Sequence, residues 1–181
     1  MSIDIFDLIH YDVWWPSFVS NIGESRYFVV FVNNYSCYNW IFHTFYCSEL
    51  LQVYCNFAKM DEAQLSKHIK NFQFDNALEY TQHAFQAILH SYGTIHNLTC
   101  LGTSQRNGRA ERKFRHILDT ICAIILSAKV PAPFWGKAAF HAINCISSTI
   151  VENQTPYKCL FGSPPDYHHL RSSTLPVFVL L

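Results

Sequence analysis

The hydrophobic period of this 181-residue chain changes near Ser48, and that change limits the folds open to the chain. Before it, residues 26–32 form a run of β-branched and aromatic side chains, and residues 38–45 alternate between apolar and polar. Both patterns are typical of strands, and the short turn between them indicates antiparallel neighbours. From residue 48 to 65 the apolar side chains recur at helical spacing instead. The sequence therefore predicts strands first and a helix covering them.

The other predicted elements follow from the same reasoning. Residues 5–12 form a first strand that ends at Asp12, and Ser48 is the expected N-cap of the helix after the third strand. The later elements are a strand ending at Asp75, helices near 84–92, 110–125, 134–146 and 156–161, and a short strand at 94–98. We predict an α/β fold with a mixed five-stranded sheet, three antiparallel strands followed by parallel additions, and helices on both faces.

Length and composition favour one folded domain. The chain is 50% hydrophobic and carries no net charge, so any surface that attracts nucleic acid must be local. We expect a core over residues 1–165 and a C-terminal extension over 166–181 that is truncated or abnormal. The seven scattered cysteines are interpreted as reduced core residues, and neither a signal peptide nor a membrane span is expected.

Three carboxylates stand at predicted element ends. Asp12 and Asp75 end two strands, Glu111 lies near the start of the longest helix, and thirty-five residues separate Asp75 from Glu111. If the two strands are parallel neighbours, the three acids meet, and two Mg²⁺ or Mn²⁺ ions would relieve their repulsion. The alternative is structural, because an acid in the first turn of a helix is favoured by the helix dipole alone.

The dense basic cluster in the chain surrounds Glu111. Its members are Arg106, Arg109, Arg112, Lys113 and Arg115, with Gln105 and Asn107 as polar neighbours. One interpretation is a DNA path with sequence-independent phosphate contacts, and the other is a solvated helix face. His10 shares the strand face of Asp12 and is interpreted as structural, and the tryptophans as packing residues.

Several motifs together resemble one known family, the integrase catalytic core of copia-type LTR retrotransposons, within the RNase H-like DDE polynucleotidyl transferases. The resemblance runs over residues 6–170. Its carriers are DLIHYDVW at 7–14, YFVVFV at 27–32, FDN at 74–76 with Glu79-Tyr80, QRNGRAERK at 105–113, PFWG at 133–136 and TPYKCLFG at 155–162. The resemblance implies that Asp12, Asp75 and Glu111 are a catalytic D,D-35-E triad.

The resemblance also implies a function. It implies two Mg²⁺ ions, 3′-end processing and strand transfer of element DNA into target DNA, a homo-oligomer, and a nuclear site of action after a cytoplasmic particle stage. No small-molecule substrate or membrane is implied. Ala77 and Leu78 stand where the family has glycines, and residues 33–37 also depart from its pattern, which indicates a degenerate copy. A catalytically inactive relic that binds nucleic acid or protein is the alternative, while an RNase H-type nuclease fits residues 105–113 poorly.

Overall fold

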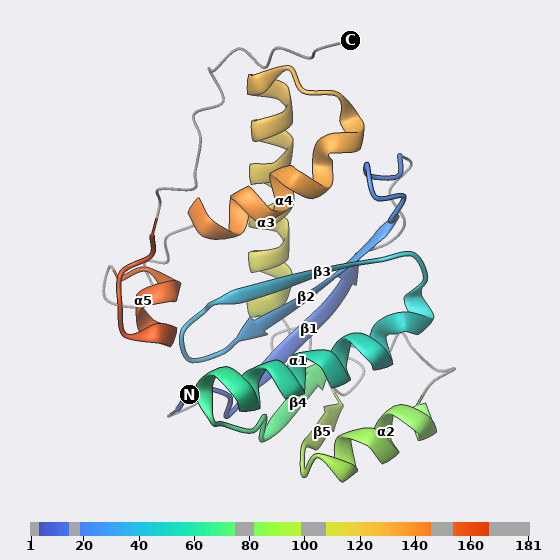
Figure 1. Cartoon of the computed structure of the whole chain (residues 1–181), viewed down its shortest axis with the longest axis vertical. Coiled ribbons are helices and arrows are strands. Elements are labelled where there is room, and N and C mark those ends of the chain that lie inside the picture. The colour runs from blue at the N-terminus through green and yellow to red at the C-terminus, as the bar shows by residue number, and fades with distance from the viewer. Residues whose placement is uncertain (1–3, 15–18, 75–81, 99–107, 146–153, 167–181) are drawn as a thin grey trace.

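A five-stranded mixed sheet with helices on both faces forms the body of the molecule (Figure 1). The computed structural model describes residues 4–14, 19–74, 82–98, 108–145 and 154–166. The strand order is β3-β2-β1-β4-β5, so β1 is the central strand. The predicted fold class is confirmed.

The first three strands are antiparallel neighbours, as their short connections predict. They are β1 (Ile9–Trp14), β2 (Tyr27–Asn33) and β3 (Asn39–Thr44). The last two, β4 (Asn71–Phe74) and β5 (Ile95–Leu98), add to the other side of β1 in parallel. Each parallel strand is reached through a helical crossover, which is the connection that parallel neighbours require.

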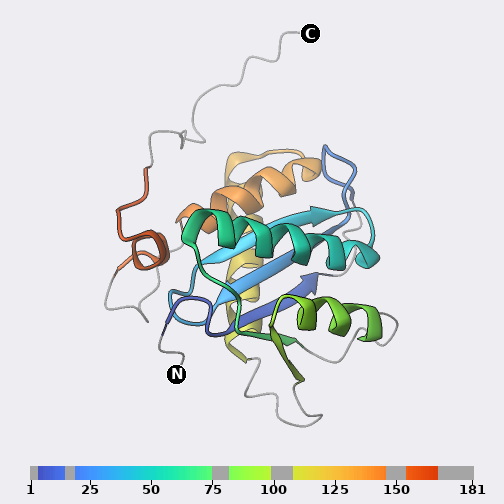
Figure 2. The same ribbon diagram turned by 60° about the horizontal axis from the view of Figure 1, so that its bottom comes forward.

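Two helices cover one face of the sheet. They are α1 (Leu50–Leu65), which lies in front of the sheet in Figures 1 and 2, and α2 (Gln82–Ser91), which lies beside β5 in Figure 1 and contributes to the same core. Aromatic rings dominate the core between them and the sheet, and its fully buried members include Phe6, Phe31, Tyr54, Phe57 and Phe72. Phe31 and Phe57, for example, have ring centroids 4.7 Å apart. This core fixes β1 and β4 side by side.

The opposite face carries a smaller, more aliphatic core. Here α3 (Gly108–Ala128) and α4 (Trp135–Cys145) pack on β2 and β3, with the short helix η3 (Ala132–Phe134) leading into α4. Ile117 and Ala139 are fully buried in this core, and α3 also contacts β1. The second layer therefore brings α3 against the central strand.

The N-terminal strand is shorter than predicted at its start. Residues 5–8 form a turn in which the Asp4 backbone N–H donates to Asp7 Oδ2 over 2.8 Å and Phe6 takes a positive φ of 65°. Lys67 and Lys70 pair with Asp4 and Asp7 at 2.6 Å each. These side-chain contacts hold the segment in a turn. The Phe6 and Leu8 carbonyls still accept from the Lys70 and Asn34 backbone N–H groups over 3.0 Å, and β1 begins at Ile9.

The start of the first helix also differs from the prediction. A 3-10 turn, η1 (Cys47–Glu49), precedes α1, and Glu49 rather than Ser48 is the N-cap residue. The Glu49 carboxylate accepts from the Phe45 backbone N–H over 3.2 Å, so it closes the preceding turn. The prediction for α5 (Pro156–Phe161) holds, because Thr155 caps the helix and Pro156 occupies its first turn.

The cysteines are less buried than predicted. Cys37, Cys55, Cys122 and Cys159 are free thiols, and of these four only Cys37 is buried. Cys37 sits in the turn between β2 and β3 with a positive φ of 56°, while Cys122 is exposed on α3. The interpretation as core residues is therefore wrong for the other three side chains.

Candidate active site

Asp12 lies on the central strand, on the face turned toward α3. Its neighbours Tyr11 and Val13 belong to the aromatic core, so side-chain alternation places Asp12 on the opposite face. Its antiparallel partner, Val30, is buried in the α3 core. The carboxylate is half-buried, and Oδ1 accepts from the Val13 backbone N–H over 2.9 Å. Asp12 is the fourth residue of β1, which continues to Trp14 rather than ending at the acid.

His10 precedes Asp12 on the same face and is a structural histidine, as predicted. It is 3% exposed, and its Nε2 lies 3.3 Å from Asn34 Oδ1 in the turn after β2. Across the parallel pair, His10 lies opposite Gln73 of β4, which is also buried. This buried polar row joins the strand of Asp12 to the strand that leads into Asp75.

The position of β4 is fixed by a hydrogen-bond chain at its start. The Tyr54 hydroxyl and Thr94 Oγ1 are 2.8 Å apart, and Thr94 Oγ1 donates to the Ile69 carbonyl over 2.8 Å. Tyr54 therefore donates to Thr94. Burial raises the pKa of Tyr54 to about 12, so this hydroxyl keeps its proton at physiological pH. The chain links α1 to the segments that enter β4 and β5.

Helix α3 carries the third predicted carboxylate and part of the basic cluster. Glu111 and Arg109 lie in its first turns, although their side chains fall outside the description. Arg112 and Arg115 are exposed. Lys113 is half-buried, and its pKa is lowered by burial, opposed by the nearby Cys37 thiol. The cluster thus divides into exposed arginines and a lysine packed beside the turn after β2.

Several predicted residues lie outside the described part of the chain. These are Asp75, Gln105, Arg106 and Asn107, together with Ala77 and Leu78. Strand β4 ends at Phe74, one residue before Asp75. Within the described ranges, no three His, Cys, Asp or Glu side chains are grouped as metal ligands. In the same ranges, no helix combines the length and apolar character needed to cross a bilayer.

A polar contact that the sequence reasoning missed ties the segment before β2 to β3, where α4 approaches both. Asn21 Oδ1 accepts from the Ser25 backbone N–H over 2.9 Å, and Asn21 Nδ2 lies 2.9 Å from His43 Nδ1. A Cβ atom on Gly136 would lie 2.8 Å from both Asn21 Nδ2 and His43 Cε1. The glycine after Trp135 was the available signal, since a close approach is a standard reason for glycine.

The aromatic partner of this contact was predicted correctly as a packing residue. Trp135 is buried, and its indole stacks on the His43 ring with centroids 5.2 Å apart. Its Nε1–H donates to the Val19 carbonyl over 2.9 Å. The PFWG motif at 133–136 therefore anchors α4 against β3 and the segment that precedes β2.

Solved structures with a similar arrangement of strands and helices identify the fold. The chain is similar to the catalytic core domain of BIV integrase, with a TM-score of 0.59 and 16% identity over 86% of this chain and 94% of that chain. It is also similar to the HTLV-2 integrase catalytic core domain in complex with magnesium, with a TM-score of 0.63 and 14% identity over 88% of this chain and 99% of that chain. The fold is that of an integrase catalytic core.

The relatives found by sequence are polyproteins of transposons. The chain is 31% identical to the Pol polyprotein of the tobacco transposon TNT 1-94 (Nicotiana tabacum), over 94% of this chain and 13% of that protein. It is 29% identical to the RE2 polyprotein of Arabidopsis thaliana, over 91% and 11%, and 27% identical to the Ty1-NL2 Gag-Pol polyprotein of Saccharomyces cerevisiae, over 84% and 8%. No family model matches the chain.

These relatives confirm the predicted resemblance. The chain is a homologue of retrotransposon Pol polyproteins and has the fold of an integrase core domain. It spans only about an eighth or less of the length of those polyproteins, as the 13%, 11% and 8% coverages state.

Proposed function

We propose that this chain is an integrase catalytic core that acts in DNA integration, with Asp12, Asp75 and Glu111 as its D,D-35-E triad. The register of the parallel strands carries the proposal. The pairs Ile9–Phe72 and His10–Gln73 each join residues 63 positions apart (72 − 9 and 73 − 10). Asp75 follows Asp12 by the same interval (75 − 12). This coincidence supports two carboxylates at matching positions of adjacent strands.

The placement of α3 supports Glu111 as the third member. Glu111 precedes Leu118 by seven residues, which is about two helical turns, so both residues share one side of the helix. Leu118 packs against the core beside the sheet, and α3 contacts β1. Asp12 lies on the sheet face turned toward that helix. The three acids would therefore converge between β1, the end of β4 and the start of α3.

The donor set fits hard divalent cations. Three carboxylates supply oxygen ligands, which Mg²⁺ and Mn²⁺ prefer, and grouped carboxylates are stabilised by cations. When bound, two such ions activate the attacking oxygen and stabilise the leaving oxygen of an in-line phosphoryl transfer. The half-buried position of Asp12 limits its freedom to turn away, so the strand would hold its carboxylate toward the site.

The DNA is expected to lie along the start of α3. Arg112 and Arg115 are exposed there and would contact phosphates, preceded by Gln105, Arg106, Asn107 and Arg109. Lys113 stays a predicted DNA contact, although its half-buried side chain beside Cys37 also suits a role in placing the helix. Because the chain has no net charge, these local cations would supply the attraction for DNA.

The biological setting follows from the relatives named above. We propose that the partners are retrotransposon DNA ends and target DNA, that the core works as a homo-oligomer, and that it acts in the nucleus after a cytoplasmic particle stage. We also propose that residues 1–165 form the catalytic unit, with 166–181 as an extension.

A strand-transfer assay tests the proposed function. With Mn²⁺ and a labelled element-end duplex, the parent should join the 3′ end to target DNA, and Asp75→Asn should lose at least about 100-fold of that activity. Asp119→Asn is the matched control, because Asp119 is exposed further along α3. Equal background in the parent and in Asp75→Asn would contradict catalysis. DNA binding without transfer would then identify an inactive RNase H-like binding module.

A further inference from the structure

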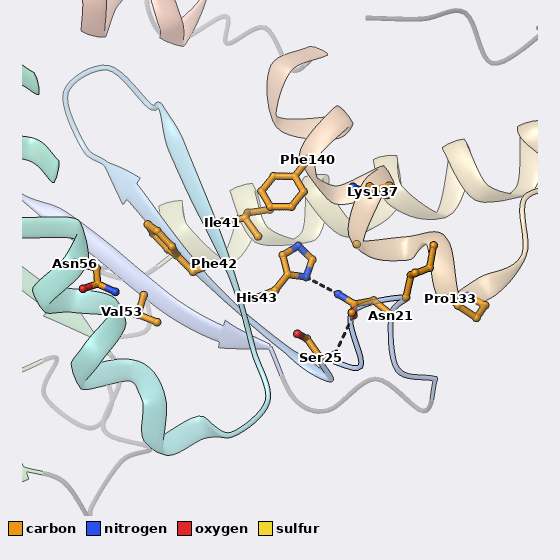
Figure 3. Close-up of a pocket in the computed structure, with 13 residues that line it drawn as sticks. Asn21, Ser25, Ile41, Phe42, His43, Val53, Asn56, Pro133, Lys137 and Phe140 are labelled. Atoms are coloured by element: carbon orange, nitrogen blue, oxygen red, sulfur yellow. Dashed lines mark hydrogen bonds between the residues drawn. The ribbon is translucent and has the colours of Figure 1, made fainter. Parts of the chain in front are cut away.

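A pocket of about 520 Å³ lies on the far side of β3 from the proposed active site, between α1, β3, α4 and the segment before β2 (Figure 3). Its apolar walls include Phe42, Val53 and Phe140. His43 and Lys137 line it as well. Its volume is within the range of pockets that hold small organic ligands. Asp12, the triad residue whose side chain the structure describes, does not line this pocket.

The hydrogen bonds around His43 determine where its proton resides. Asn21 Oδ1 is occupied by the Ser25 backbone N–H, so the Asn21 amide group presents Nδ2–H to His43 Nδ1. His43 Nδ1 must then be an acceptor, which places the single hydrogen of the neutral ring on Nε2. Burial and the nearby Lys137 ammonium lower the pKa of His43, in agreement with a neutral ring.

The Nε2–H donor of His43 has no acceptor. Nε2 is buried and has no hydrogen-bond partner in the described part of the chain. A buried donor without a partner is unfavourable by roughly 1–3 kcal/mol, so the structure favours anything that supplies an acceptor. The Phe140 ring, 4.9 Å from the His43 ring, covers this side, and Phe140 is itself 49% exposed. A ligand therefore reaches Nε2 only after the Phe140 ring turns aside, and exposed side chains make such rotations quickly.

The charge of the pocket selects the acceptor. Lys137 is exposed at the same end as His43, and the described residues that line the pocket include no Asp or Glu. The pocket has a hydrogen-bond donor, His43, and a cation, Lys137, at one end, and the apolar side chains of Phe42 and Val53 at the other. This arrangement is complementary to an anionic acceptor on an apolar stem.

We infer that this pocket binds a carboxylate carried on an apolar or aromatic stem. The carboxylate accepts from His43 Nε2–H and pairs with the Lys137 ammonium, and the stem lies against Phe42 and Val53. The ligand is either a free carboxylic acid or the C-terminal carboxylate of a peptide with an apolar last residue. Both share this chemistry, and the proposal is independent of the triad.

Titration calorimetry on the full chain with 3-phenylpropionate tests the proposal. The acid should bind, and its neutral counterpart 3-phenylpropanamide should bind roughly tenfold more weakly, because the charge-assisted hydrogen bond is lost. Lys137→Gln should weaken binding of the acid about fivefold, as expected for an exposed ion pair. Lys59→Gln, an exposed lysine of α1 outside the pocket, should leave binding unchanged.

A second measurement keeps the test independent of affinity changes. The His43 Nε2–H signal in ¹H–¹⁵N NMR should shift on addition of the acid. A short peptide ending in leucine and phenylalanine, with a free or an amidated C-terminus, shows whether a peptide terminus also enters. Saturable binding of the free-acid forms alone supports the pocket. Equal binding of acid and amide, or binding of the acid that Lys137→Gln leaves intact, overturns the proposal, as does the absence of binding.

Discussion

His10 of β1 lies opposite Gln73 of β4 in a parallel pair, and both side chains are buried. Asp12 lies two residues further along β1, and in the sequence Asp75 follows Phe74, the last residue of β4. The relationship matters because a one-residue slip of the register would turn the side chains of one strand to the other face of the sheet. The aromatic core on the far side, with Tyr11 stacked on Phe72 at 4.9 Å, opposes such a slip.

The hydrogen-bond chain at the start of β4 should be sensitive to which partner is removed. Thr94→Val leaves both the Tyr54 hydroxyl and the Ile69 carbonyl without their partner, so it should lower the free energy of unfolding by roughly 2–4 kcal/mol. Tyr54→Phe removes one donor and leaves the Thr94–Ile69 bond, so it should cost only about 1 kcal/mol. Urea unfolding measures both, and an equal cost for the two variants would contradict the assigned bond directions.

Gly136 is expected to be essential for the approach of α4 to His43. Gly136→Ala places a Cβ 2.8 Å from Asn21 Nδ2 and His43 Cε1, so the helix or the Asn21 contact must shift, at about 1–3 kcal/mol. Gly23→Ala is the matched control, because its added Cβ meets Asn21 Oδ1 at an ordinary 3.4 Å. Thermal unfolding should therefore separate the two variants. A Gly136→Ala protein as stable as Gly23→Ala would refute the close approach.

Asp61 should make the protein less stable as pH rises. This residue of α1 is 1% exposed, neither of its carboxylate oxygens has a hydrogen-bond partner among the described residues, and burial raises its pKa to about 8. The folded state therefore keeps the proton that the unfolded chain releases near pH 4. The stabilising effect is full below about pH 4 and is lost progressively as pH rises to about 8.

Replacing that carboxyl group should remove the pH dependence. Asp61→Leu should raise the free energy of unfolding at pH 8 by about 1–3 kcal/mol and flatten its slope between pH 5 and 8. Glu62→Gln, at the exposed neighbouring position, serves as the control and should keep the slope of the parent. Denaturant unfolding across this pH range gives both quantities. A parent protein with constant stability from pH 5 to 8 would show that Asp61 is not buried as described.

The exposed arginines of α3 should contribute to DNA affinity without sequence preference. Arg112→Gln and Arg115→Gln should each weaken binding of an unrelated duplex and reduce the slope of log affinity against log salt by about 1. Lys59→Gln on α1, on the other face of the sheet, should change neither quantity. Fluorescence anisotropy over a salt series measures the slopes. Unchanged slopes in both arginine variants would place the DNA elsewhere.

The sequence predicted those elements whose local pattern and tertiary setting agree. Strand β2 follows from its β-branched and aromatic run, and α3 from the helical spacing that buries Ile117 and Ile121. Residues 5–8 look apolar enough for a strand, yet the carboxylates of Asp4 and Asp7 hold them in a turn with lysines that arrive 63 residues later in the chain. No local pattern carries that information.

The buried polar side chains were not predicted from the sequence either, because local spacing does not show which polar groups become buried. Asp61 continues the stripe of Tyr54 and Phe57 on α1, so helical spacing alone places it on the buried face, but a carboxyl group there is not expected. His43 and Asn21 lie 22 residues apart, and their contact is packed beside Trp135 and Gly136 of α4, which are about 90 residues further along the chain. The carboxylate triad was predicted from spacing and from resemblance to a known family, and because Asp75 lies outside the described residues it stays a prediction.

The number of Mn²⁺ ions bound is the most direct test of a metal site shared by Asp12, Asp75 and Glu111. Titration of the parent chain followed by electron paramagnetic resonance should show two ions bound, while Asp12→Asn, Asp75→Asn and Glu111→Gln should each lose at least one of them. Asp119→Asn, at an exposed position of α3, should bind as the parent does. If the three variants bind Mn²⁺ with the stoichiometry and affinity of the parent, the carboxylates do not form a shared metal site.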